Sequence, residues 1–179
     1  TLVLGTSAGH GALTGMFADL IIMLEGSAMF TAGPPLVKAS LGLDATIDEL
    51  GGALMHTTTS GVAHNLGRTE EECFAMACYF LSVLPQHSGL SVTDTHDTAG
   101  RGKRRVDKLL DIIPPQSNQA YDMRQVLSEI CDSESVFELQ PEYGKNLIVA
   151  IATVGGTPCM LLANQPMIQA GAITVDAAD

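Results

Sequence analysis

A glycine-rich segment near the start of the chain constrains its fold most strongly. Residues 1–4 are β-branched and apolar, glycines follow at positions 5, 9 and 11, and small residues continue to position 18. This order predicts a strand, a turn and a helix. Because glycine lets the backbone approach a ligand and the first N–H groups of a helix favour negative charge, we expect an anion at this turn.

The residues of this turn leave three interpretations open. Gly5, Gly9 and Gly11 have the GxxxGxG spacing of short-chain dehydrogenases, in which Glu25 would bind a ribose hydroxyl. None of the three tyrosines has a lysine four positions later, so the catalytic pair of that class is missing. The N–H groups could instead stabilise an oxyanion that forms during a reaction. The glycines could also serve only to pack a strand tightly against a helix.

Composition limits the partners and the compartment. The chain has 179 residues, 46% of them hydrophobic, and a formal net charge of −11, which favours a globular protein and argues against nucleic acid or anionic membranes as partners. The four cysteines form no CxxC pair and are expected to act as small hydrophobic residues in a reducing compartment. No apolar run approaches the length of about 20 residues that a membrane span needs. We therefore expect a soluble protein of the cytoplasm, or of the mitochondrial matrix in a eukaryote.

Short elements follow the first turn. The continuous apolar run at residues 19–24 predicts a strand buried on both faces, and a second short strand is expected at residues 28–30. Proline after Gly33 predicts a short helix through residues 36–39. Glycines and threonines between residues 44 and 66 predict loops and short helices.

A longer helix is predicted from residue 70 to about Pro85. Thr69 and Glu72 have the spacing of a capping box at its start. Its core-facing residues are expected to recur at helical spacing. The predicted stripe consists of Phe74, Ala77, Cys78 and Leu81.

The second half of the chain has a different pattern. Residues 86–105 are polar and end in a basic cluster, residues 101–105, which is predicted to lie in a solvated linker and could alternatively contact phosphates. A helix is expected at residues 122–130. Two apolar runs, residues 146–154 and 159–163, flank Gly155 and Gly156 and predict a β-hairpin.

Two histidines and a serine stand at four-residue spacing and raise the question of a metal site. His56, Ser60 and His64 would share one face of a helix. The threonines at positions 57–59 and the glycine at position 61 argue against a regular helix there. We therefore expect no metal at these residues.

Several blocks of this sequence resemble one family. The glycine-rich run at residues 5–11, the strand opened by Asp19 and the strand closed by Phe30 are similar to the crotonase superfamily. The whole chain resembles the carboxyltransferase (β) subunits of biotin-dependent acyl-CoA carboxylases of the propionyl-CoA and methylcrotonyl-CoA type. The blocks that carry this resemblance, in family order, are residues 31–39, 49–53, His56, 60–64, 146–149 and 163–166.

The resemblance implies the fold and the domain organisation. It implies an α/β, crotonase-like domain, a spiral of ββα units, with the start of a second similar domain. Residues 1–85 would be the C-terminal part of the first domain, residues 86–120 a linker, and residues 121–179 the start of the second domain. Both ends are expected to be cuts through a larger protein, and the fragment alone is expected to have no turnover.

The resemblance also implies a site in the first turn. The backbone amides of Gly9 and His10 would hold the thioester oxygen of an acyl-CoA as its enolate forms, although the family usually has a glycine where His10 stands. Leu36 occupies the place of the glutamate of crotonase hydratases, which disfavours hydration chemistry. The substrate-binding residues would be Ala8, Gly11, Gly33 and Pro34, with no metal.

The activity implied is transfer of a carboxyl group from carboxybiotin to the α-carbon of an acyl-CoA. Biotin would be carried on a separate carrier domain and served by a biotin carboxylase subunit, and the full protein would form a homo-hexameric ring. A second pair of amides, on the biotin side, would lie beyond Asp179. The alternatives are a biotin-dependent acyl-CoA decarboxylase, an NADP-binding short-chain dehydrogenase-like domain and a catalytically silent scaffold.

Overall fold

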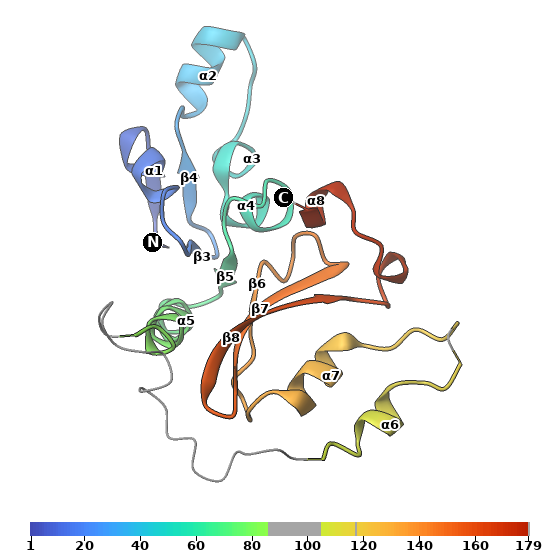
Figure 1. Cartoon of the computed structure of the whole chain (residues 1–179). Helices are drawn as coiled ribbons and strands as arrows, with labels where there is room; N and C mark the ends of the chain where they lie inside the picture. Colours follow the sequence, from blue (N-terminus) through green and yellow to red (C-terminus); the bar gives the residue numbers. More distant parts are fainter. Residues whose placement is uncertain (86–104, 117, 179) are drawn as a thin grey trace. The chain divides into compact units, whose positions relative to one another are not determined.

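The computed structural model describes residues 1–85, 105–116 and 118–178 (Figure 1). These residues form two compact units, Thr1–Leu81 and Ser82–Asp179, and each is described by itself. Much of the predicted linker and residues 101–104 of the basic cluster lie outside the described residues, so the linker and the domain boundaries stay predictions. None of the described helices is long and apolar enough to cross a membrane.

The first unit repeats a pair of short strands followed by helix. Its elements are, in chain order, β1 (Leu2–Val3), β2 (Thr6–Ala8), α1 (His10–Gly15), β3 (Ile22–Leu24), β4 (Ala28–Phe30), α2 (Pro34–Leu41), α3 (Ile47–Gly51), α4 (Ala53–Thr58), β5 (Asn65–Gly67) and α5 (Glu70–Ser82). In Figure 1, α2 projects away from the end of β4, and none of its residues is buried.

The strands of the first unit lie in two parallel sheets. One sheet has the order β1-β3-β5, and the other pairs β2 with β4. The two strands of each repeat therefore enter different sheets, which winds the chain into a spiral. Ile22 and Met23 of β3 are almost fully buried, as the continuous apolar run predicts.

The prediction of a single glycine-rich turn between the first strand and the first helix is partly wrong, because part of this segment forms a strand. Residues 6–8 form β2, in register with residues 28–30 of β4. The sequence hides this strand because small and polar residues give no alternating apolar pattern, and its partner lies more than 20 positions away. The helix that follows ends at Gly15 instead of continuing to Ala18.

The prediction against a helix around His56 is also wrong in part. Helix α4 includes Thr57 and Thr58, whose hydroxyls donate to the carbonyl oxygens of Ala53 (3.0 Å) and Leu54 (2.7 Å). These bonds to the preceding turn satisfy the hydroxyls inside the helix.

Helix α5 begins as predicted but turns a different face inward. Glu72 donates its N–H to Thr69 Oγ1 (3.2 Å), while its carboxylate accepts from the N–H of Arg68 (2.8 Å). The predicted stripe is wrong: Cys73 is fully buried, whereas Phe74 and Leu81 are 49% and 64% exposed. Cys73 packs on β5, where Gly67 has no side chain to block its thiol.

The second unit is an antiparallel sheet of the order β6-β7-β8 with short helices. The predicted hairpin and the helix before it are confirmed. Gly155 and Gly156 join the two long strands with φ of +60° and +79°, which suits a two-residue turn of type I′. The elements are α6 (Leu109–Ile112), α7 (Met123–Ile130), β6 (Phe137–Leu139), β7 (Leu147–Val154), β8 (Thr157–Asn164), the 3₁₀ helix η2 (Gln169–Gly171) and α8 (Val175–Ala178).

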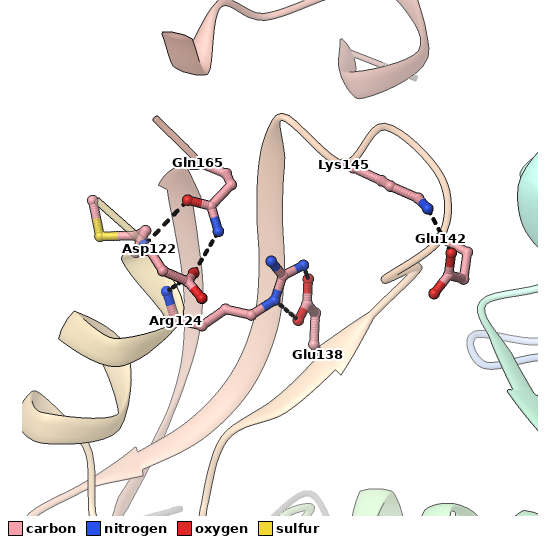
Figure 2. Close-up of polar contacts among 7 residues, drawn as sticks. Asp122, Arg124, Glu138, Glu142, Lys145 and Gln165 are labelled. Atoms are coloured by element: carbon pink, nitrogen blue, oxygen red, sulfur yellow. Dashed lines mark hydrogen bonds and ion pairs between the residues drawn. The ribbon is translucent and has the colours of Figure 1, made fainter. Parts of the chain in front are cut away.

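Polar contacts fasten α7 to this sheet, as Figure 2 shows. The fully buried Gln165 accepts the N–H of Met123 (3.1 Å) and donates to the carboxylate of Asp122 (2.6 Å), the N-cap of α7. Arg124 reaches Glu138 with two hydrogen bonds of 2.7 and 2.6 Å. Helix α7 is thus held at its start by Glu138 of β6 and by Gln165, which directly follows β8.

Candidate active site

The candidate site lies at one edge of the two-stranded sheet. Ala8 of β2 and Phe30 of β4 are register partners in a parallel pair, so the residues after both strands leave the sheet at the same edge. All six residues predicted for the site follow or end these strands. Ala8, His10 and Gly11 are exposed, and Gly9, Gly33 and Pro34 are half-buried.

Gly9 is the turning point between β2 and α1. Its φ of +64° and ψ of −127° are a conformation that favours glycine. Its N–H donates to the carbonyl oxygen of Phe30 at 2.9 Å and so extends the ladder between β2 and β4. The expectation that the Gly9 amide is a free donor therefore does not hold, because the sheet already occupies it.

The next two amides are differently placed. His10 and Gly11 are the first two residues of α1, and their N–H groups have no acceptor among the described residues. No side chain caps this helix and no acidic residue lies in its first turn. The turn therefore presents two neighbouring N–H donors at an exposed helix start, an arrangement that favours an anionic oxygen.

The start of α2 forms the other part of the edge. Gly33 is the N-cap of this helix, and a Cβ at this position would lie 3.3 Å from the ring of Phe30. Pro34 occupies the first helical position, where a missing N–H costs no hydrogen bond. Leu36 is 59% exposed in this helix.

Sequence reasoning missed the support behind β4. His56, 5% exposed, places Nε2 2.6 Å from the carbonyl oxygen of Met29 and Nδ1 2.8 Å from Ser60 Oγ. His64 Nδ1 instead accepts the N–H of Ile21 (3.1 Å), and burial lowers the pKa of this histidine. The two imidazoles thus hold different strands. The described residues contain no group of three or more His, Cys, Asp or Glu able to hold a metal ion.

The geometry argues against the dinucleotide interpretation. A dinucleotide-binding turn leads directly from a strand into a helix, so that all its glycines surround one phosphate site. Here β2 lies between Gly5 and Gly9 and belongs to a second sheet. A spiral of paired strands and helices, with the exposed start of one helix beside the end of β4, defines instead a crotonase-like α/β protein.

Comparison with known proteins gives the family. The family model described as the carboxyl transferase domain matches residues 1–179. The chain therefore belongs to the carboxyl transferase domain family. This confirms the resemblance to carboxyltransferase subunits.

Individual relatives agree with this membership. The chain is 34% identical to the propionyl-CoA carboxylase carboxyltransferase subunit of Haloferax mediterranei, over 99% of the chain and 34% of that protein. It is 33% identical to the methylmalonyl-CoA decarboxylase subunit alpha of Veillonella parvula, over 100% of the chain and 35% of that protein. The chain thus spans about a third of the length of these relatives.

A solved structure confirms the fold. The chain is similar to the transcarboxylase 12S hexamer, crystallised with hydrolysed methylmalonyl-coenzyme A bound, with a TM-score of 0.87 and 31% identity. The similarity covers 99% of this chain and 35% of that one. The crotonase-like α/β fold is therefore confirmed.

Proposed function

We propose that the protein containing this chain transfers a carboxyl group from carboxybiotin to the α-carbon of an acyl-CoA. Membership of the carboxyl transferase domain family supports this reaction class. The single observation that carries the site is the pair of N–H groups of His10 and Gly11 at the exposed start of α1, which find no acceptor in the part of the chain that the structure describes.

These amides would act on the thioester oxygen. Removal of the α-proton turns the acyl-CoA into an enolate, and its negative charge develops on that oxygen. Two N–H groups fixed by the backbone stabilise the charge without reorganising, and each such donor is worth about 2.7–4 kcal/mol in the barrier. Gly9 would act as the pivot that aims them, while Ala8, Gly33 and Pro34 would form the walls beside the acyl group.

The proton chemistry would come from outside this turn. The residues that form this edge of the sheet include no carboxylate, and Leu36 stands where a hydratase would have one. When bound, carboxybiotin would supply both the carboxyl group and the base that takes the α-proton. Neutral amides with no acid in the first turn fit this role, since they stabilise an enolate without competing for its proton.

The partners belong to the same proposal. A biotin carboxyl carrier and a biotin carboxylase subunit would deliver carboxybiotin, and the whole protein would assemble as a homo-hexameric ring in the cytoplasm or the mitochondrial matrix. The transcarboxylase 12S hexamer with its coenzyme A ligand supports the assembly and the acyl-CoA substrate. The four cysteines, all among the described residues, form no disulfide with one another, which suits a reducing compartment.

A second candidate function is the reverse reaction. The Veillonella relative is a decarboxylase subunit, and its 33% identity is close to the 34% of the Haloferax carboxylase subunit. The same enolate would form in carboxylation and in decarboxylation, so the two amides would stabilise it in either reaction.

The test is deletion of one amide in the full-length enzyme. His10→Pro removes the N–H at the first helical position, where proline fits the backbone, and His10→Ala keeps the N–H while removing the imidazole. We expect kcat of His10→Pro to be about 10²–10³-fold below that of His10→Ala, as for the loss of one oxyanion donor. Equal carboxyl-transfer rates for the two variants would overturn the proposed site.

A further inference from the structure

Strand β4 is held along both of its edges. On one edge the carbonyl oxygen of Phe30 accepts the Gly9 N–H (2.9 Å). On the other edge the carbonyl oxygens of Ser27 and Met29 point towards α3 and α4, because successive carbonyls of a strand alternate in direction. The Ser27 oxygen accepts the N–H of Ala53 at 3.0 Å, so helix α4 takes the place of a neighbouring strand.

His56 completes this second edge. Its Nε2 lies 2.6 Å from the Met29 oxygen, and a carbonyl can only accept, so Nε2 must carry the hydrogen. Its Nδ1 lies 2.8 Å from Ser60 Oγ, which fixes the ring at its other nitrogen. Both ring nitrogens of this buried imidazole are therefore used to hold one backbone oxygen in place.

Gly51 lets α3 approach close enough for this contact. A Cβ at position 51 would lie 2.1 Å from the Met29 oxygen and 3.0 Å from the Cβ of Phe30. The helices α3 and α4 thus press directly on the two residues that end β4. This support is local to the strand that carries Phe30.

We infer that His56, oriented by Ser60, is a positioning residue for the turn that carries the proposed oxyanion donors. By holding the Met29 carbonyl on one edge, it sets the plane of the next peptide, whose Phe30 oxygen binds Gly9 on the other. Gly9 in turn determines where the amides of His10 and Gly11 point. The inference rests on the proposed function for its catalytic consequence, and the geometry of the turn can be measured without it.

The experiment uses four variants of the full-length protein. His56→Leu removes the donor at similar volume, and His56→Gln keeps an N–H donor at the position of Nε2. Ser60→Ala removes the partner that orients the ring, together with a longer hydrogen bond from the N–H of Val62 (3.4 Å), at an exposed residue. His64→Leu is the matched control, because it removes a histidine whose Nδ1 accepts the N–H of Ile21, the residue before β3.

Two readouts separate positioning from general stability, both taken below the unfolding temperature of each variant. Hydrogen–deuterium exchange of peptides covering residues 6–12 reports the Gly9 hydrogen bond, and kcat and KM for the acyl-CoA report the reaction. We expect His56→Leu to raise exchange in this segment and to lower kcat by about 10²-fold, the effect of a misplaced catalytic group. His56→Gln should restore both readouts to within a few-fold, and His64→Leu should leave both unchanged.

Each outcome decides the inference. Wild-type exchange over residues 6–12 in a folded His56→Leu variant would overturn it, and so would raised exchange with wild-type kcat. If His56→Leu does not fold, Ser60→Ala decides: raised exchange with a several-fold lower kcat supports the inference, and no change in either overturns it. If the wild-type enzyme transfers no carboxyl group, the proposed function fails, while the exchange measurement still decides whether His56 positions the turn.

Discussion

The N–H of Gly9 and the carbonyl oxygen of Phe30 are joined by a hydrogen bond of 2.9 Å between two parallel strands. This bond determines where α1 begins, since no side chain caps that helix. The amides offered to a ligand are therefore those of the two residues after Gly9. The site consequently depends on the pairing of β2 with β4.

Gly9→Ala should destabilise the protein through its backbone alone. No atom lies within 4 Å of the position that a Cβ would take, but φ is +64°, and such strain costs about 1–3 kcal/mol. We expect the free energy of unfolding to fall by this amount in chemical denaturation. Gly5→Ala, which also meets open space but lacks the positive φ, is the control and should be close to wild type. Equal stability of the two variants would contradict this account.

Gly51→Ala should be destabilising for a different reason. Its Cβ would lie 2.1 Å from the backbone oxygen of Met29, which cannot move without disturbing β4. Overpacking of this kind costs about 1–3 kcal/mol or more. Thermal unfolding should show a lower Tm than for Gly15→Ala, whose Cβ would meet only side chains at 3.4 Å or more. A Tm at or above that of Gly15→Ala would show that α3 can shift away from β4.

Gln165→Leu should weaken the second unit. The buried amide of Gln165 accepts the N–H of Met123 and donates to the carboxylate of Asp122. Leucine would remove both hydrogen bonds. A buried N–H left unsatisfied costs about 1–3 kcal/mol. Gln125→Leu, at an exposed position of α7, should change the unfolding free energy by no more than about 0.5 kcal/mol. A similar loss in both variants would mean that the hydrogen bonds of Gln165 contribute nothing specific.

The elements that could be predicted from the sequence carry their signal locally. The apolar run around Met23, the glycine pair between β7 and β8, and the cap Thr69 each depend on residues close in sequence. The candidate site in the first turn, which stays a prediction, was inferred from a local signal of the same kind, since glycines and a helix start stand together there.

The details that were missed depend on partners distant in sequence. Strand β2 exists because β4 pairs with it, and the Gly9 amide is occupied because Phe30 lies beside it. The separate roles of His56 and His64 were missed in the same way, since their rings contact Met29 of β4 and Ile21, the residue before β3. The periodicity of apolar residues and the local composition describe one segment at a time. They contain no information about pairings between distant segments.

The stability of the first unit should depend on the protonation of His64. Its Nδ1 accepts the N–H of Ile21, which requires an unprotonated nitrogen, and burial lowers its pKa below the ordinary value of 6.5. Above this value both the folded and the unfolded chain hold the neutral ring, so the stabilisation is fully present. As the pH falls below 6.5, the unfolded chain binds a proton first, and stability is lost down to the folded pKa. His64→Asn keeps an acceptor near the position of Nδ1 but does not titrate, so its unfolding free energy should fall less between pH 7.5 and 5.5 than that of the wild type. Parallel pH profiles for the two proteins would exclude His64 as the group responsible, because every other titrating residue is shared.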